Sequence, residues 1–239
     1  MTGASGATAL PQGSEKVRAV DRMFDAIAPR YDLLNRLLTF GMDVRWRKKA
    51  VRSLDLGAGS TVLDVGCGTG DLCRVLGAAG HHAVGIDRSG GMLAGAQGRR
   101  SGGAALVRGD GTSLPVGDHS VDGIVSGFTL RNLVSLAAFL DECGRAVRPG
   151  GRIALLEVST PTNPVLRAGH GAYFGRVVPF VGGLLSDRAA YSYLPKSVAY
   201  LPPDDEIVAM VGRAGFQDVH RRALSVGIAQ LITGTRSAP

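Results

Sequence analysis

The feature that most constrains the fold is a buried strand that runs directly into a glycine-rich turn. The β-type run 61–65 is followed by Gly66, Gly68 and Gly70, and a helical pattern begins at the last of these glycines. Glycine allows the sharp turn and lets the backbone approach a ligand closely at the carboxyl end of the strand. The sequence therefore predicts an α/β fold with a ligand site at this turn.

Strands and helices alternate after this turn. Helical stretches at 70–79, 89–99 and 136–147 separate short β-type runs, and Pro149-Gly150-Gly151 is expected to close the last helix; the β-type runs are 61–65, 83–86, 105–107, 123–125 and 153–158. This rhythm predicts a parallel sheet covered by helices on both faces, with right-handed crossovers. A helix at 204–214 and two further β-type runs, 216–223 and 227–235, predict a closing hairpin and seven strands in total.

The regions on either side of this core differ in pattern. Residues 1–14 are predicted to be a disordered tail, and residues 15–54 an N-terminal helical cap with breaks at Pro29 and Gly41. Helical periodicity in the first part of the cap comes from Val17, Val20, Met23, Phe24 and Ile27. Residues 55–239 form the main domain, in which 163–200 is a Gly-rich, apolar and aromatic insertion without clear periodicity.

Composition excludes several classes of protein. With 45% hydrophobic and 20% charged residues the chain is globular, and no apolar run approaches the ~20 residues of a membrane-spanning helix. The first residues lack the basic and apolar regions of a secretory signal. Cys67, Cys73 and Cys143 have no metal-like spacing, so we expect reduced thiols, no metal and a cytoplasmic protein.

The net charge of +7 raises the question of an acidic partner. Basic residues are scattered, except for a denser stretch at Arg45, Arg47, Lys48, Lys49 and Arg52. A solvated helix face explains this stretch most simply, and without a nucleic-acid motif we expect no nucleic-acid partner. Attraction to an anionic membrane surface is the alternative, and contact there would be peripheral because nothing spans.

Three strand ends indicate what the ligand is. A dinucleotide fingerprint needs a third glycine where this chain has Asp71, whereas G-x-G-x-G after a strand carrying Asp64 suits S-adenosylmethionine. Asp87 ends the second strand, where it can accept both ribose hydroxyls, and Asp110 follows the third, where it can accept from an adenine amino group. Taken singly, each residue has a structural explanation: Asp is favoured at a helix N-terminus, which would explain Asp87, and in turns, which would explain Asp110. Together they predict a site for one nucleoside-sized ligand.

These residues carry a family resemblance. Residues 62–71, Asp87 and 109–111 resemble a Rossmann-like class I S-adenosylmethionine-dependent methyltransferase. More narrowly, the chain is similar over about 17–236 to the menaquinone and ubiquinone C-methyltransferase family. The motifs that carry this are Phe24-Asp25-x-Ile27-Ala28-x-x-Tyr31-Asp32-x-x-Asn35, Phe40-Gly41, Trp46, Phe128-Thr129-Leu130-Arg131-Asn132-Leu133, 148–151, 156–159, Tyr191-x-Tyr193-Leu194-Pro195-x-Ser197 and 214–216.

The resemblance and the strand ends together give the predicted cofactor-binding residues. They are Asp64, Gly66, Gly68, Thr69, Gly70, Asp87, Asp110 and Gly111. The chain departs from the family's pattern at Gly127, where a serine is common and Ser126 stands beside it, and at Asp43-Val44, Thr129 and 230–234. These departures leave the methyl donor in place and loosen the identity of the acceptor.

The resemblance also implies an acceptor and its chemistry. For a quinol, Arg131 would stabilise a developing phenolate, Asn132 would orient a hydroxyl, and Tyr31 and Asp32 would close the site or relay a proton. Each has a structural alternative: a helix cap for Arg131 and Asn132, packing for Tyr31 and an N-cap for Asp32. Trp46 and Cys67 are expected to pack, and His170 and His220 to lie on the surface or in loops.

We therefore expect methyl transfer to carbon of a prenylated quinol such as demethylmenaquinol, giving menaquinol. A related methyltransferase acting on another small aromatic or natural product is the alternative, and a binding module without activity is a third. Residues 173–185 are expected to receive a polyprenyl tail, with a homodimer surface or a core helix as alternatives. The enzyme would be cytoplasmic or peripheral to the inner face of the membrane.

Overall fold

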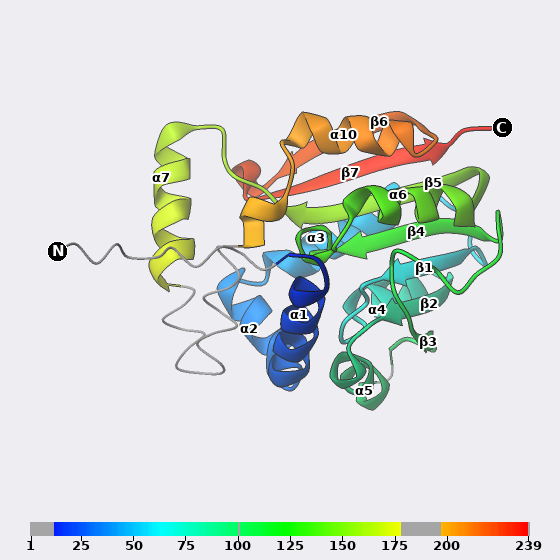
Figure 1. Ribbon diagram of the computed structural model, residues 1–239, viewed down its shortest axis with the longest axis horizontal. Helices are drawn as coiled ribbons and strands as arrows, with labels where there is room; N and C mark the ends of the chain where they lie inside the picture. Colours follow the sequence, from blue (N-terminus) through cyan, green and yellow to red (C-terminus); the bar gives the residue numbers. More distant parts are fainter. Residues whose placement is uncertain (1–11, 100, 178–196, 239) are drawn as a thin grey trace.

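The computed structural model describes residues 12–99, 101–177 and 197–238, and these form a seven-stranded sheet between two layers of helices (Figure 1). The order of strands across the sheet is β3-β2-β1-β4-β5-β7-β6. Strand β7 runs antiparallel to both of its neighbours, β5 and β6, and the other strand pairs are parallel. The strands are β1 (Thr61–Val65), β2 (His82–Asp87), β3 (Ala105–Arg108), β4 (Val121–Gly127), β5 (Val147–Val158), β6 (Phe216–Leu224) and β7 (Ala229–Arg236). The predicted seven-stranded, mostly parallel sheet is confirmed.

Continuous apolar runs place β1, β4 and β5 at the centre of the sheet, because these strands are covered on both faces. One face packs against α4 (Asp71–Ala78), with Leu72 and Leu76 in its core. The other packs against α6 (Leu136–Ala146) and α10 (Asp204–Arg213), with Phe139 and Ile207 fully buried. Helix α5 (Gly90–Gly98) begins at Ser89, whose side chain accepts a hydrogen bond from the Met92 N–H.

The N-terminal region consists of three helices, α1 (Gly13–Ile27), α2 (Tyr31–Leu38) and α3 (Met42–Ser53). Helices α1 and α2 lie beside the carboxyl ends of the parallel strands (Figure 1). In helix α3, Trp46 and Ala50 belong to the same apolar cluster as residues of β1 and α4. The third helix of the expected cap is therefore part of the layer that covers the sheet.

Two segments differ from the predicted pattern. Pro149-Gly150-Gly151 does not follow α6 as a loop but lies within the first part of β5, opposite an irregularity in β4. Residues 164–172 form α7 (Pro164–Ala172), which continues into a π-helical turn, Tyr173–Val177. The Asn163 side chain caps α7 by accepting from the N–H groups of Val165 (3.0 Å) and Leu166 (3.3 Å).

Some predictions lie outside the described residues. They concern the tail up to residue 11 and most of the apolar stretch 173–185, of which only 173–177 is described, together with the motif at 191–195. In the part of the chain that is described, no helix is long and apolar enough to cross a membrane. The described residues also include three short 3₁₀ turns, η1 (Leu130–Asn132), η3 (Val198–Tyr200) and η4 (Ser225–Gly227).

Candidate active site

The carboxyl ends of β1 to β4 open into a cavity of about 700 Å³, here named the strand-end cavity. Its wall combines the glycine turn, the ends of β2 and β4, the loop after β3 and helix α1. The lining residues are Val20, Asp21, Phe24, Tyr31, Val65, Gly66, Gly68, Ile86, Asp87, Arg88, Ser89, Met92, Gly109, Asp110, Gly111, Gly127, Phe128, Thr129, Asn132 and Leu133. The topology thus brings together residues up to 113 positions apart in sequence.

The glycine turn shapes one side of this cavity. Gly66 (φ +74°) and Gly68 (φ +54°) adopt left-handed backbone conformations, which favour glycine. A Cβ on Gly66 would lie 2.3 Å from Oγ1 of Thr129, so no larger residue fits. Thr129, one of the departures from the family's pattern, therefore packs directly on the glycine turn.

Asp87 is held by backbone donors at the end of β2. Its Oδ2 accepts from the N–H of Gly68 (2.8 Å) and its Oδ1 from the N–H of Ser89 (2.9 Å). Burial raises the pKa of Asp87, although these backbone hydrogen bonds favour the charged form. The carboxylate is therefore fixed in orientation at the wall of the cavity.

Asp110 is more open to solvent. Its Oδ1 accepts from the N–H and the hydroxyl of Thr112, both at 2.9 Å, and its Oδ2 is paired with Arg88. Burial pushes the pKa of Asp110 upward, but the Thr112 hydrogen bonds and the charge of Arg88 outweigh it, so the pKa lies below its ordinary value. Arg88 also pairs with Asp21 of α1 (3.3 Å), which ties the cap to this end of the site.

Three predicted cofactor residues do not line the cavity. Asp64 is fully buried beneath the glycine turn; its Oδ2 accepts from Sγ of Cys73 (3.3 Å), and burial raises its pKa to about 7. The hydroxyl of Thr69 donates to Asp32. Gly70 (φ +80°) packs so closely that a Cβ would lie 3.0 Å from Cβ of Ser101. These residues support the turn, whereas Gly66, Gly68, Asp87, Asp110 and Gly111 line the cavity.

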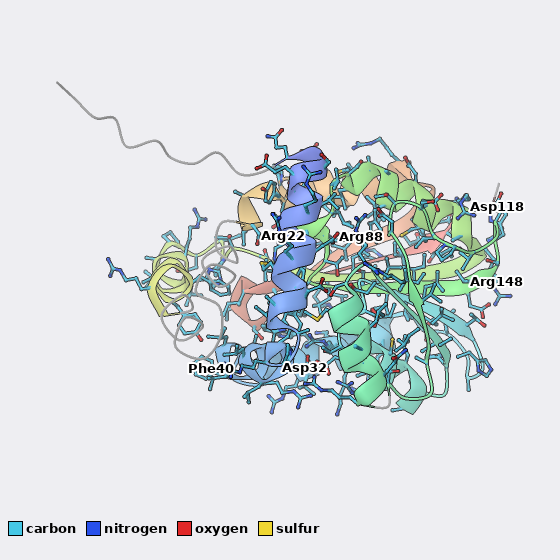
Figure 2. The ribbon with its side chains drawn as sticks, turned by 60° about the horizontal axis from the view of Figure 1, so that its bottom comes forward. Arg22, Asp32, Phe40, Arg88, Asp118 and Arg148 are labelled. Atoms are coloured by element: carbon cyan, nitrogen blue, oxygen red, sulfur yellow. The ribbon has the colours of Figure 1, made fainter. Side chains whose placement is uncertain are left out.

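The sequence analysis missed the contribution of α1, whose Val20, Asp21 and Phe24 line the strand-end cavity. The helix is tied down by Asp25, whose Oδ1 accepts from the Ser89 hydroxyl (2.5 Å) and the Gly91 N–H (3.1 Å). In Figure 2, α1 crosses in front of the site and Arg88 lies beside it. The apolar stripe of α1 indicates a helix, but it does not by itself indicate that the helix lines a cavity.

A second and larger cavity, about 1280 Å³, lies next to the first and is here named the apolar cavity. It is walled by α2, the start of α3, α7 and the turns that follow β4, β5 and β6. Its lining residues are Tyr31, Asn35, Leu38, Thr39, Phe40, Met42, Asp43, Trp46, Phe128, Arg131, Val158, Pro161, Val165, Leu166, Gly169, His170, Tyr173, Phe174, Val226 and Ile228.

Tyr31 and Phe128 line both cavities and form the partition between them. Phe128 has a φ of +61°, a strained conformation for a bulky residue, and strain of this kind is retained where the surroundings fix it. Its ring lies 6.2 Å from the ring of Trp46 and 5.4 Å from the guanidinium of Arg47. The ring of Tyr31 packs edge-to-face on Phe24 at 5.9 Å.

The four predicted catalytic residues are distributed unevenly around this partition. Tyr31 is part of it, Arg131 faces the apolar cavity and Asn132 faces the strand-end cavity. Arg131 is buried in an ion pair with Glu157, which also accepts from the Arg131 N–H (3.3 Å). Asn132 donates to the carbonyl of Phe128 (3.3 Å).

Asp32 lines neither cavity. It is buried, pairs with Arg99 and accepts from Thr69, so it joins α2 to the glycine turn instead of facing a substrate. It is not an N-cap either, because Arg30 occupies that position in α2. Ser126 does not replace the serine expected at Gly127, since its hydroxyl is buried and donates to the Val65 carbonyl (2.7 Å).

Comparison with known proteins gives a family for this arrangement. A model of the ubiE/COQ5 methyltransferase family matches residues 12–236. The ubiquinone/menaquinone biosynthesis C-methyltransferase UbiE of Syntrophotalea carbinolica is 43% identical over 91% of this chain and 94% of its own length. The demethylmenaquinone methyltransferase of a Roseiflexus species is 41% identical over 96% of this chain and 98% of its own.

Solved structures resemble the fold. The complex of the Haloferax volcanii Trm112 methyltransferase activator with a methyltransferase contains a chain that matches with a TM-score of 0.67, at 18% identity over 90% of this chain and 98% of that one. Phosphoethanolamine N-methyltransferase 2 of Haemonchus contortus, solved with S-adenosyl-L-methionine, matches with a TM-score of 0.58, at 15% identity over 77% of this chain and 50% of that one. At such identities the likeness shows the fold alone.

Proposed function

Because the chain belongs to the ubiE/COQ5 methyltransferase family, whose members are S-adenosylmethionine-dependent methyltransferases, we propose that it methylates a ring carbon of a prenylated quinol such as demethylmenaquinol. The observation that carries the proposal is the pair of cavities with a common aromatic partition. A cavity at the strand ends that is bordered by the carboxylates of Asp87 and Asp110 suits a nucleoside, and a larger apolar cavity suits a ring with a hydrocarbon tail.

The residues of the strand-end cavity fit S-adenosylmethionine. The fixed carboxylate of Asp87 would accept from ribose hydroxyls, and Asp110 with Gly111 would border the adenine. The tight packing around Gly66 and Gly111 supports this, because a Cβ at either position would be crowded by neighbouring side chains that border the cavity. When bound, S-adenosylmethionine supplies a methyl group activated by a sulfonium sulfur. Asp64, Thr69 and Gly70 act indirectly, by holding the glycine turn.

On the acceptor side, Tyr31 and Phe128 would orient the ring against the partition and exclude water from it, which aligns the reacting atoms. A free phenol titrates near ~10, so the acceptor hydroxyl needs help to lose its proton. Arg131 borders the place where negative charge would develop, but its own charge is already balanced by Glu157. Asn132 holds the Phe128 backbone and Asp32 holds Thr69, so both are positioning residues.

The rim of the apolar cavity supports peripheral contact with a membrane surface. Phe40, Val165 and Val226 line the cavity and are 76%, 79% and 68% exposed. These side chains come from three separate segments, and exposed apolar groups gathered in this way mark an interaction site. A tailed acceptor could pass from the bilayer into the cavity across this rim.

Sedimentation with anionic vesicles tests this contact. A variant with Phe40→Ser and Val165→Ser should bind the vesicles less than the parent does. Equal binding would exclude a role of these rim side chains in membrane contact.

The direct test is transfer of a labelled methyl group from S-adenosylmethionine to chemically reduced demethylmenaquinol. Product should form from the quinol and not from the oxidised quinone, since only the quinol has an electron-rich ring. Cofactor binding without product would point to another small aromatic acceptor. Failure to bind S-adenosylmethionine would contradict the assignment of the strand-end cavity.

A further inference from the structure

One titratable group of the apolar cavity has no role in the chemistry described so far. His170 lies on α7 and lines the cavity, contrary to the expected surface or loop position. Its Nε2 is buried and has no hydrogen-bond partner among the described residues. The ring lies 4.4 Å from that of Phe174, which packs on the same apolar cluster as Tyr31 and Phe24.

Most other polar side chains that line the apolar cavity already have a hydrogen-bond or ion-pair partner. Arg131 is paired with Glu157, and Asp43 with Arg47 and the Thr39 hydroxyl (2.9 Å). The hydroxyl of Tyr173 donates to the Leu38 carbonyl (2.9 Å), and Nε1 of Trp46 donates to Oγ of Ser225 (2.9 Å). Among the described ionisable side chains that line the cavity, this leaves the hydroxyl of Tyr31 and Nε2 of His170 to form hydrogen bonds with a substrate.

The protonation state of His170 suits a base. Burial lowers its pKa from the ordinary value of 6.5, so the imidazole is neutral at pH 7 and one ring nitrogen carries a lone pair. A buried polar atom without a partner destabilises the folded state. In a cavity that binds a ligand, such an atom is explained by a hydrogen bond that the ligand provides.

We propose that His170 is a catalytic base, with Nε2 accepting the proton of a phenolic hydroxyl on the acceptor ring. The inference rests on the proposed function. The O–H bond breaks and an N–H bond forms on His170, while the electron pair stays on oxygen and enriches the adjacent ring carbon. That carbon bonds to the methyl group as the bond from methyl to sulfur breaks, with its electron pair going to sulfur. The ring carbon then releases its proton to solvent, the C–H electron pair restores the aromatic ring, and the imidazolium returns its proton to the phenolate oxygen, so that one proton is released overall.

The assignment predicts how activity depends on pH. Protonated His170 cannot accept a proton, so kcat/KM should fall as the pH drops through its pKa, below 6.5. The other ionisable side chains that line the cavity are Tyr31, Asp43, Arg131 and Tyr173. Arg167 and Arg176, on the helical segment that carries His170, are exposed. The loss of activity at low pH should come from His170 and not from these groups.

Two variants separate the chemical role from a structural one. His170→Gln keeps a hydrogen-bonding group that is not a base, and His170→Phe keeps ring volume. Both should lower kcat by about 100-fold, within the range for loss of a general base, and both should lose the acid limb. The Kd for S-adenosylmethionine should stay within twofold of the parent value. His220→Gln, on β6 and away from both cavities, is the matched control and should leave both constants unchanged.

The proposal is overturned if His170→Gln keeps kcat within threefold of the parent with the acid limb intact. If the parent enzyme itself fails to methylate the quinol, the proposed function fails, and His170 is then judged by binding alone. In that case 1,4-naphthohydroquinone is added to the ¹⁵N-histidine-labelled enzyme. A shift in the His170 ring resonances that 1,4-naphthoquinone does not produce would retain the hydroxyl contact, and no shift would exclude it.

Discussion

Single side chains at the strand ends show how location sets charge. Asp64, Asp87 and Asp110 follow or belong to three neighbouring strands, yet their environments differ. Burial raises the pKa of Asp64 and Asp87, whereas hydrogen bonds and Arg88 overcome burial and lower that of Asp110. The carboxylates that face the cavity are fixed by donors, and the one beneath the turn has a buried oxygen, Oδ1, without a partner.

Replacing Asp87 by Asn should weaken cofactor binding. The amide cannot accept as strongly from ribose hydroxyls or from the Gly68 N–H, and a hydrogen bond to a charged group contributes about 1.5–3 kcal/mol. We therefore expect the Kd for S-adenosylmethionine, measured by calorimetry, to rise about 10- to 100-fold. Asp118→Asn is the control, since its side chain is 70% exposed; an unchanged Kd in Asp87→Asn would contradict the ribose assignment.

Asp64 should give the stability of the fold a distinct pH dependence. Its pKa is raised from 3.8 to about 7, so between these values the folded state holds a proton that the unfolded state has lost. The contribution of Asp64 to the free energy of unfolding is fully present below about pH 4 and is lost as the pH rises through 7. Asp64→Asn should remove this loss and, at pH 8, increase the free energy of unfolding by about 2–4 kcal/mol. Urea unfolding at pH 5 and pH 8 measures it, and parallel pH trends in the two proteins would refute the prediction.

At the scale of elements, local pattern was sufficient for the sheet. The range predicted for β1 is the observed one, and the other strands and the helices between them differ mainly at their ends. Helix α7 was missed because the glycines at 169 and 171 obscure its periodicity, although Asn163-Pro164 is a typical helix start. Its position beside α2, and hence the role of His170, depends on tertiary packing that no local pattern encodes.

For the candidate site, the sequence predicts the positions that follow from strand ends better than those that depend on tertiary contacts. Asp87, Asp110 and the first glycines were found because parallel strand ends converge on one edge of a sheet. Asp32 was misplaced because its motif does not reveal that it faces Thr69 and Arg99. Glu157, the partner of Arg131, was quoted within a motif but given no role, since the ion pair joins residues 26 positions apart.

Helix α1 should control exchange of the cofactor. Asp25 is a principal tie between α1 and the start of α5, so Asp25→Ala should loosen the helix that covers the strand-end cavity. Hydrogen–deuterium exchange should become faster in 13–27, and release of S-adenosylhomocysteine should speed up. Arg22→Ala, on the same helix and exposed, is the control. If exchange in 13–27 were the same in both variants, the tie would be unimportant.

At the scale of the molecule, the fold has three layers (Figure 1), and both cavities are lined by residues that follow the carboxyl ends of its parallel strands. Cofactor binding should therefore stabilise the whole domain by mass action. At 100 times its Kd a ligand contributes about 2.7 kcal/mol. For a chain of this size, we expect Tm to rise by about 5–10 °C in scanning calorimetry with S-adenosylmethionine. NAD at the same concentration serves as control, and an equal rise with NAD would contradict the selectivity inferred from Asp71.

The partition of Tyr31 and Phe128 has a consequence for the kinetic order of the reaction. Two cavities that share one wall can be filled at the same time, and no cysteine lines either of them in the described part of the chain, so a thiol that could hold the methyl group between two half-reactions is missing there. Transfer should then proceed within a ternary complex. Double-reciprocal plots at several fixed acceptor concentrations should intersect, where a ping-pong enzyme would give parallel lines. A chiral methyl group should arrive inverted, because a single in-line displacement inverts the configuration at the methyl carbon.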